Sequence, residues 1–378
     1  MKRLVLFVLS ALLFAAPITN AQDDSGAQTL FMTFIPNVQF SPVYVALEKG
    51  YFAEADIDLA IEHGDEPLGV DLIAAGERQF GLISGEQLLT ARAQERPVVF
   101  VYEWFQRYPI GVVTSVDSGI ETVADLRGRR VGIPGRFGAS YSGLIALLSA
   151  NGLTEQDIDL QEIGFNAPEV VCIGGVEAST IYVNNEPLQI LNRAAAGDCG
   201  DITDVRVFAV ADDADMVSNG IITNEETIAT QPELVASLVG AFDAGLRDVI
   251  NNPAEAYLLS LGYVESLPIS DELRTTLEAA ATEQSEWLLA NPDATREDIA
   301  ARRADLDTAL RETFSDDDLI QFEVLLSSID LWDADQLGLT EAASWEVTQT
   351  TLVEMGFMET PLADLSAAYT NDFLPSTE

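Results

Sequence analysis

The feature that most limits the fold of this chain is a regular alternation of short β-like runs with short amphipathic helices. The run PVVFVYEWF, residues 97–105, is largely apolar, which is typical of a strand buried on both faces of a sheet. The β–α–β order predicts a parallel sheet whose strands are joined by right-handed crossovers. The elements expected in this first unit are strands at 29–36, 57–63, 79–85 and 97–105 and helices at 42–49, 67–75 and 85–94.

A second unit of the same type follows, and the chain then returns to the first. Two passages of chain between α/β units form a hinge, and a hinge implies a cleft. We therefore expect an α/β fold of two lobes around a central cleft. Lobe 1 is expected at 28–113 and lobe 2 at 114–217, and 218–378 should return to lobe 1 and add C-terminal helices. The elements expected in lobe 2 are strands at 110–115, 130–135, 179–185 and 205–212 and a helix at 140–151.

The first 21 residues have the pattern of a secretory signal peptide. Lys2 and Arg3 precede an apolar run at 4–16, and Thr19-Asn20-Ala21 resembles a cleavage site for signal peptidase. The apolar run is too short to span a bilayer, and no cysteine stands at the expected cleavage point. The pattern predicts export to the periplasm or the exterior of the cell envelope, without a lipid anchor.

Charge and cysteine content narrow the function further. The formal net charge is −43, which opposes binding to nucleic acid and to anionic membranes. We interpret this acidity as a solubility feature or an adaptation to salt. The two cysteines, Cys172 and Cys199, are expected to form a disulfide in an oxidising compartment. With His63 as the only histidine, no metal site and no cofactor are expected.

The loops after the strands supply the candidate ligand contacts, because ligands of open parallel sheets bind beyond the carboxyl ends of the strands. These residues are mainly aromatic, amide or hydroxyl side chains, which suit a flat heterocycle. Strand alternation sends Trp104 and Phe105 to opposite faces, so only one of them should reach the cleft. The candidates are Asn37, Gln39, Tyr44, Ser84, Glu86, Trp104, Gln106, Arg136, Phe137, Ser140, Tyr141, Tyr182, Asn184 and Glu186.

Several of these candidates have a purely structural alternative. Tyr44 lies on a helix with apolar neighbours and suits the core as well as a ligand contact. Glu86 in a first helical turn is favourable to the helix dipole whatever else it does. Asn184 and Glu186 can cap a turn, and Arg136 can be an ordinary surface charge. The residue pattern leaves these alternatives open.

The glycine-rich stretch GIPGRFGASYSGL, residues 132–144, raises the possibility of phosphate chemistry. No Gly-Lys-Ser/Thr follows it, and its spacing does not match G-x-G-x-x-G. We interpret it as a strand end, a turn and a helix start with Ser140 as the N-cap, whose backbone N–H groups could donate hydrogen bonds to a ligand oxygen. No G-x-S-x-G motif occurs, and no carboxylate pair is singled out by spacing, so we expect no catalytic residues and no enzyme.

Several segments resemble one known family in order along the chain. They are VYVALEKGYFAEADIDL, AAGERQFGL, LLTARAQERPVVFV, TVADLRGRRVGIPG and YTNDFL. They resemble the periplasmic solute-binding proteins of ABC importers, in the branch for thiamine pyrimidine precursors, riboflavin, nitrate and alkanesulfonates. The resemblance implies a type II binding fold that closes on its ligand, and permease and ATPase partners. A relative that synthesises the thiamine pyrimidine uses a histidine and a cysteine cluster, and this chain has no such cluster.

The ligand is expected to be a small heteroaromatic molecule. A sulfonate or nitrate site needs converging cations or donors, and Arg136 is the only cationic candidate for the cleft. FIPNVQFSPVYVA, SGEQLLTARAQ and EWFQRYPIGVV look most like the riboflavin and thiamine-pyrimidine binders. We favour riboflavin, then a thiamine pyrimidine precursor, then an alkanesulfonate or nitrate. The alternative classes are a pyrimidine-synthesising enzyme and a ligand-sensing module for a membrane receptor.

Overall fold

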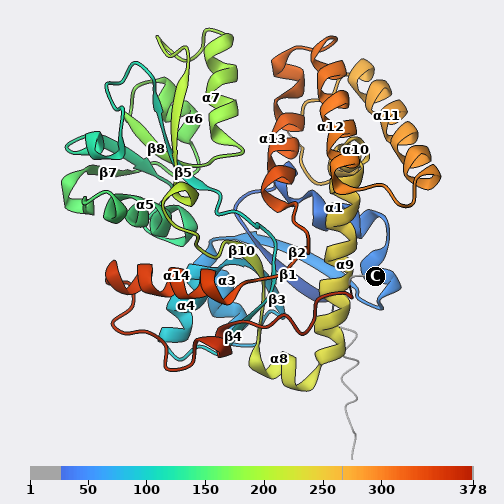
Figure 1. The fold of residues 1–378 in the computed structure, drawn as a ribbon, viewed down its shortest axis with the longest axis horizontal. Helices are drawn as coiled ribbons and strands as arrows, with labels where there is room; N and C mark the ends of the chain where they lie inside the picture. Colours follow the sequence, from blue (N-terminus) through green and yellow to red (C-terminus); the bar gives the residue numbers. More distant parts are fainter. Residues whose placement is uncertain (1–26, 266, 377–378) are drawn as a thin grey trace, which may run out of the picture.

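The computed structural model describes residues 27–265 and 267–376, so the signal peptide predicted at 1–21 lies outside the described residues. The chain folds into two lobes, each built on a five-stranded sheet, as expected (Figure 1). The first sheet has the order β2-β1-β3-β10-β4. Its strands are β1 (Gln28–Thr33), β2 (Leu59–Gly64), β3 (Phe80–Ser84), β4 (Val98–Glu103) and β10 (Asn219–Asn224).

The second sheet has the order β7-β6-β8-β5-β9, which repeats the topology of the first. The whole of β5 pairs with β8 and β9, so the second lobe starts at Ile110. The boundary expected between residues 113 and 114 falls inside this strand and is corrected accordingly. The strands of this sheet are β5 (Ile110–Ser115), β6 (Arg130–Ile133), β7 (Asp159–Glu162), β8 (Ala178–Tyr182) and β9 (Val205–Ala209).

One strand in each sheet contradicts the parallel arrangement that the β–α order predicts. β10 runs antiparallel to β3 and β4, and β5 runs antiparallel to β8 and β9. Both strands are entered directly from the other lobe rather than through a crossover helix, so nothing requires them to be parallel. The amino end of β10 therefore lies at the same sheet edge as the carboxyl ends of β3 and β4.

Helices cover both faces of each sheet and close the hydrophobic cores. α3 begins with Pro67 at its amino end, where the missing N–H is harmless, and is followed by Gly76 in the left-handed conformation. The lobe 1 helices are α1 (Ser41–Glu48), α2 (Tyr51–Glu54), α3 (Glu66–Ala74), α4 (Gly85–Ala93), α8 (Glu225–Thr230) and α9 (Pro232–Asn251). The lobe 2 helices are α5 (Gly138–Ala150), α6 (Ala167–Cys172) and α7 (Glu186–Ala195).

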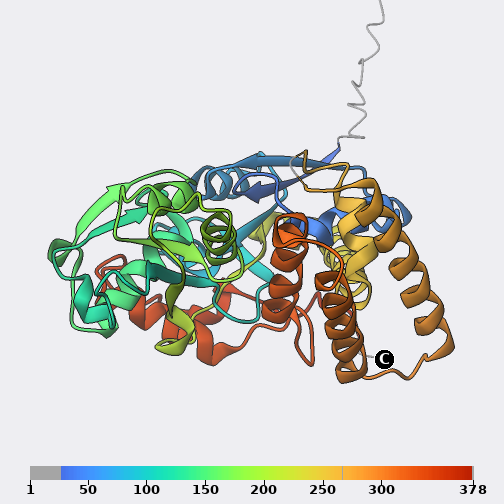
Figure 2. The same ribbon diagram turned by 90° about the horizontal axis from the view of Figure 1, so that it is seen from above.

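The C-terminal helices extend lobe 1 and reach the second lobe. α10 to α13 stand together beside α1 and α9, and α13 lies opposite α7 (Figures 1 and 2). The chain then returns to the first sheet, where Tyr369 bridges to Phe100 and stacks on Trp345, with ring centroids 5.0 Å apart. These helices are α10 (Pro253–Ser260), α11 (Asp271–Ala290), α12 (Arg296–Arg311), α13 (Asp316–Trp332) and α14 (Ala342–Glu354).

Short 3₁₀ segments complete the described secondary structure. They are η1 (Val38–Phe40), η2 (Val123–Leu126), η3 (Glu155–Asp157), η4 (Val210–Asp212) and η5 (Leu365–Ala368). Of these, η1 lies at the cleft, directly after β1 and before α1. In the parts of the chain that the structure describes, no helix has the length and apolar character needed to cross a bilayer.

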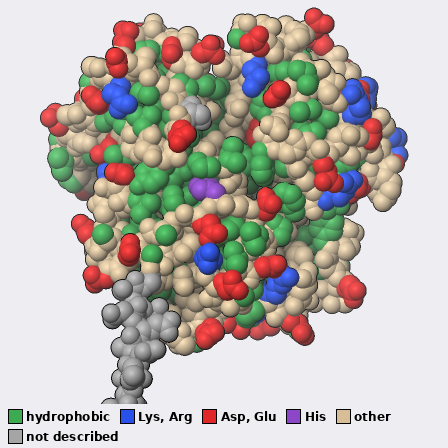
Figure 3. All heavy atoms as spheres, turned by 180° about the vertical axis from the view of Figure 1, so that it is seen from behind, with side chains coloured by type: hydrophobic (Ala, Val, Ile, Leu, Met, Phe, Trp, Pro, Cys, Tyr) green, Lys and Arg blue, Asp and Glu red, His purple; other side chains and the backbone are tan. Residues whose placement is uncertain are grey.

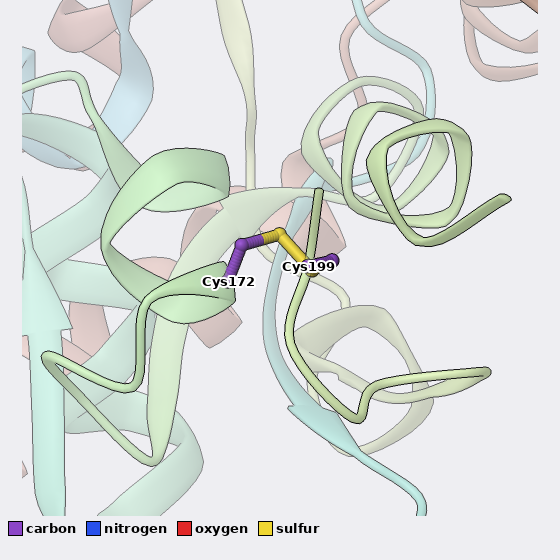
Figure 4. Close-up of a disulfide and its surroundings, with 2 residues drawn as sticks. All are labelled: Cys172 and Cys199. Carbon is purple, nitrogen blue, oxygen red and sulfur yellow. A yellow bond between two sulfur atoms is a disulfide. The ribbon is translucent and has the colours of Figure 1, made fainter. Parts of the chain in front are cut away.

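The predicted disulfide is confirmed. Cys172 at the end of α6 is bonded to Cys199 in the loop after α7, and both residues are buried (Figure 4). They pack in a small cluster with Val171 and Ile190 behind the second sheet. The bond ties together the two helices on that side of lobe 2.

Candidate ligand-binding site

A cavity of about 730 Å³, measured to its open mouth, lies between the two lobes at the carboxyl ends of the parallel strands. Lobe 1 contributes the ends of β1 and β2, η1, the start of α3, the chain after β4 and the first residue of β10. Lobe 2 contributes the segment from β6 into α5, the loop after β7, and the segment from β8 into α7.

Seven of the nineteen described residues that line the cavity are aromatic. They come from both lobes and are Phe34, Phe40, Trp104, Phe105, Phe137, Phe165 and Tyr182. Phe34 and Phe165 meet edge to face across the cleft, with ring centroids 4.9 Å apart. Phe40 and Trp104 lie side by side in lobe 1, with centroids 5.8 Å apart. Such a wall suits a flat ring system that can stack between the lobes.

Both Trp104 and Phe105 line the cavity, so the expectation that only one of them reaches the cleft is wrong. β4 ends at Glu103, and the strand alternation ends with it. The N–H groups of Trp104 and Phe105 both donate to the carbonyl of Asn219, at 3.0 and 3.1 Å. This turn directs two consecutive rings toward the ligand space.

Six of the predicted contact residues line the cavity: Gln39, Trp104, Phe137, Ser140, Tyr182 and Glu186. Ser140 lies in the first turn of α5 but is not its N-cap. The helix begins at Gly138, and Phe137 is the N-cap residue. The predicted start of the helix at residue 140 is therefore two residues late, because Gly138 adopts a left-handed φ of 64° within the first turn.

Three further predicted residues lie next to the cavity and support it. Asn37 accepts a hydrogen bond from the Gln39 N–H at 3.0 Å and so fixes η1. Asn184 of lobe 2 donates to the Gln39 amide oxygen at 2.9 Å and to the Ser328 hydroxyl of α13 at 2.7 Å. Gln106 donates to the Glu103 carbonyl at 2.7 Å. These side chains hold both lobes and the C-terminal helices together at the cleft.

Three predicted residues face elsewhere. Tyr44 is buried in the lobe 1 core and stacks on Tyr263, with centroids 4.5 Å apart. The Arg136 side chain is 42% exposed and pairs with Glu155 and Glu162 of its own lobe. Tyr141 donates to Glu155 at 2.6 Å and stacks on Phe357 of the C-terminal segment. Tyr44 and Arg136 thus have the structural contacts named above as their alternatives, and Tyr141 packs against the C-terminal segment.

Ser84 and Glu86, also predicted, lie buried behind the cavity floor. The Glu86 carboxyl accepts a hydrogen bond from the Tyr108 hydroxyl at 2.9 Å. Burial, reinforced by the neighbouring charge of Glu66, raises the pKa of Glu86 to about 8. Glu86 is therefore largely protonated at neutral pH.

Glu66 connects the cavity floor to the opposite lobe. Its carboxylate accepts hydrogen bonds from the Ser84 N–H at 2.5 Å and from the Ala139 N–H of α5 at 3.3 Å. Burial raises the pKa of Glu66 above its ordinary value, and the hydrogen bonds from Ser84 and Ala139 offset only part of that rise.

A third carboxyl, Glu186, opens α7 at the lobe 2 side of the cavity. Burial raises its pKa to about 7, and it accepts a hydrogen bond from the Tyr182 N–H at 2.8 Å. The Tyr182 hydroxyl donates to the Asn219 amide oxygen at 3.2 Å, which links lobe 2 to the start of β10. Glu186 and Asn219 together offer acceptors and a donor to the edge of a bound ring or to hydroxyl groups.

The ionisable side chains among the described residues that line the cavity are Asp65, Glu66, Glu186 and Tyr182. None of them is cationic. His63 lies nearby, its ring 5.4 Å from that of Phe40 and its Nδ1 3.0 Å from the Phe34 carbonyl. Burial lowers the pKa of His63, so it is neutral at pH 7. In Figure 3 the histidine side chain lies within a band of hydrophobic side chains across that face.

The described residues hold no group of three or more His, Cys, Asp or Glu side chains arranged for a metal ion. Only two cysteines occur in the sequence, and the disulfide uses both. The cavity presents aromatic rings, amides, hydroxyls and carboxyls to its interior.

The residues that sequence reasoning missed have identifiable causes. Asp65 and Glu66 follow β2, and the rule that selects loops after strands would have found them had it been applied to that strand. The rule could not select Asn219, because Asn219 begins an antiparallel strand instead of following a parallel one. Phe165 follows β7, whose polar sequence DLQE gives no strand signal. Phe40 and Phe105 lie in loops that the rule did select.

Comparisons with known proteins agree with this geometry. The family model described as NMT1/THI5 like matches residues 37–256. Riboflavin-binding protein RibY of Chloroflexus aurantiacus is 32% identical over 369 residues, covering 96% of this chain and 90% of that protein. A formylaminopyrimidine-binding protein of Halalkalibacterium halodurans is 26% identical, covering 67% of this chain and 76% of that protein.

The family also contains enzymes. A 4-amino-5-hydroxymethyl-2-methylpyrimidine phosphate synthase of Legionella pneumophila is 26% identical over 234 residues, covering 61% of this chain and 72% of that protein.

Solved structures share the fold at low sequence identity. The periplasmic aliphatic sulphonate binding protein of Escherichia coli has a TM-score of 0.52 and 16% identity, covering 83% of this chain and 94% of that one. A ligand-binding component of an ABC-type import system from Staphylococcus aureus has a TM-score of 0.58 and 9% identity, covering 92% and 97%. The chain belongs to the NMT1/THI5-like family and has the two-lobed α/β fold of periplasmic solute-binding proteins.

Proposed function

We propose that this protein is the substrate-binding component of an ABC importer and that its ligand is riboflavin. The observation that carries this proposal is the cavity between the lobes, which seven aromatic side chains line and whose ionisable groups include no lysine, arginine or histidine among the described residues. An isoalloxazine ring can stack between the aromatic side chains of the two lobes. Ribityl hydroxyls and the ring N–H can donate to carboxyl and amide oxygens, such as those of Glu186 and Gln39.

The charge of the wall supports a neutral ligand over an anion. Sulfonate or nitrate recognition calls for cations or several free donors. The nearest predicted cation, Arg136, is held on the outside of lobe 2 by Glu155 and Glu162. A thiamine pyrimidine precursor remains the second candidate, because a relative is named as a formylaminopyrimidine-binding protein.

A role in binding rather than catalysis is part of the proposal. The relative described above that synthesises the thiamine pyrimidine uses a histidine and a cluster of cysteines. Here both cysteines are committed to the disulfide, and His63 lies outside the set of side chains that line the cavity. The proposed partners are a permease and an ATPase, and the proposed location is the periplasm or cell-envelope exterior, reached through the signal peptide at 1–21.

Ligand binding to the purified mature protein tests the proposal. Trp104 lines the cavity and packs against Phe40, so a stacked flavin should quench tryptophan emission. Riboflavin, formylaminopyrimidine and taurine are titrated separately, followed by fluorescence and by calorimetry. We expect riboflavin to bind with a Kd of about 1 μM or tighter, and taurine not to bind at millimolar concentration. Binding of formylaminopyrimidine but not riboflavin would select the second candidate, and binding of taurine alone would contradict both.

A further inference from the structure

Helix α5 reaches the cavity with its amino end, and no side chain of its own segment caps that end. Its N-cap residue, Phe137, makes no side-chain hydrogen bond, and no acidic residue lies in its first turn. The first N–H groups of a helix lack partners within the helix and attract negative charge. Gly138, Ala139 and Ser140 of this first turn all line the cavity.

Glu66, from α3 of the opposite lobe, supplies the missing acceptor. Its carboxylate accepts from the Ala139 N–H at 3.3 Å and is anchored on its own lobe by the Ser84 N–H at 2.5 Å. A Cβ atom at Gly138 would lie 2.3 Å from the Glu66 carboxylate oxygen. The glycine thus lets the carboxylate lie directly against the backbone of α5. Glu66 is only 6% exposed, so the contact is a fixed feature of the closed lobes.

We infer that Glu66 determines the ligand charge that this cavity accepts, because its carboxylate fills the anion-binding position at the amino end of α5. This inference rests on the proposed function only in that the cavity must be a solute site. A free anion entering here would have to displace Glu66 or share the position with it, and like charges so close exclude the wrong ligand. The protein carries its own anion at the place where a sulfonate or sulfate would otherwise lie.

The residue behind Glu66 also gives no support to a bound anion. Glu86 lies below it, hydrogen-bonded to Tyr108 at 2.9 Å, and offers no cation to an incoming anion. No lysine or arginine is among the described side chains that line the cavity. Removing Glu66 should therefore leave the N–H groups of Ser84 and Ala139 free to bind an external anion.

Two substitutions at one position and a neighbouring control test the inference. Glu66→Ala removes the carboxylate and opens the space. Glu66→Gln keeps the shape and removes only the charge. Asp65→Asn removes one negative charge from the adjacent wall position, which is exposed and not hydrogen-bonded to α5. Sulfate, taurine and riboflavin are titrated into each variant and the wild type by calorimetry, with thermal melting as the measure of folding.

We expect Glu66→Ala to bind sulfate or taurine at least about tenfold more tightly than the wild type, and Glu66→Gln to gain less because its amide still fills the space. Asp65→Asn should gain much less than Glu66→Ala, because it weakens the repulsion but frees no N–H group of α5. Equal anion affinity in the folded Glu66 variants and Asp65→Asn would overturn the inference, and Glu66→Gln decides alone if Glu66→Ala fails to fold. Anion gain in Glu66→Ala together with no riboflavin binding in the wild type would contradict the proposed ligand and leave this inference standing.

Discussion

At the scale of single residues, the site depends on one close approach between the lobes. Gly138 combines a left-handed φ of 64° with contact to the Glu66 carboxylate from the other side of the cleft. Either property alone would favour glycine at this position. Together they mean that a side chain here would strain α5 and also hold the lobes apart.

Gly138→Ala should therefore lower both stability and ligand affinity. The matched control is Gly128→Ala, because Gly128 has a φ of 74° and no atom within 4 Å of its added Cβ. The control should lose about 1–2 kcal/mol from the free energy of unfolding, which is the usual cost of a left-handed alanine. Gly138→Ala should lose more than the control and should also weaken riboflavin binding, as measured by urea unfolding and by titration. Equal losses in the two variants would show that contact with Glu66 has no energetic consequence.

Sequence reasoning found part of this site and missed its centre. The apolar runs and the loops after them supplied Gln39, Trp104 and Tyr182, which line the cavity. Glu66 is different, because its role depends on a backbone N–H of the other lobe, and no local pattern encodes that partner. Arg136 shows the opposite failure, since its charge looked available for a ligand until Glu155 and Glu162 were found beside it.

At the scale of elements, local signals located strands and helices well but not their directions. β10 was expected as a returning strand, yet its antiparallel insertion between β3 and β4 follows from the path of the chain between lobes. α13 was expected only as part of a helical region. Its Ser328 reaches Asn184 of lobe 2 because the C-terminal helices fold back toward the cleft. Contacts between segments so far apart in sequence cannot be predicted from the pattern of neighbouring residues.

The disulfide stabilises one such set of elements. Cys172 and Cys199 are 27 residues apart in sequence. In the unfolded chain, their bond limits the conformational freedom of the segment between them, which includes α7 in the folded protein. The double variant Cys172→Ala, Cys199→Ala should lose about 2–4 kcal/mol from the free energy of unfolding. Urea unfolding measures the loss, and reduction of the wild type with dithiothreitol provides the control. We expect riboflavin affinity to change little, because neither cysteine lines the cavity. An unchanged stability in both experiments would contradict a structural role for the bond.

At the scale of the whole molecule, the protein combines a highly acidic exterior with buried carboxyls that resist ionisation. Burial raises the pKa of Glu103 to about 7, of Glu186 to about 7 and of Glu86 to about 8. Two of these surround the ligand cavity, and Glu103 lies at the start of the crossing between the lobes. The strand ends where the lobes meet are therefore held together partly by protonated carboxyls.

Stability should consequently fall as the pH rises from about 5.5 to 8. Between the ordinary glutamate pKa and the raised values, the folded state binds more protons than the unfolded state, so the slope of stability against pH is negative. The stabilisation is fully present below the ordinary glutamate pKa, decreases as the pH rises above it, and is lost once the pH has passed through 7 to 8. Exposed carboxylates are already largely ionised in this window. The lowered pKa of His63 has the opposite sign and acts only below about pH 6.5.

Glu103→Gln isolates one of these groups, because Glu103 is buried and lies outside the ligand cavity. Its neutral amide resembles the protonated carboxyl and cannot ionise. We expect the free energy of unfolding of this variant to fall less steeply between pH 5.5 and 7 than that of the wild type, by up to about 1.4 kcal/mol per pH unit. Chemical unfolding at several pH values measures both slopes. A flat wild-type profile, or two parallel profiles, would show that the buried carboxyls do not hold their protons in the folded protein.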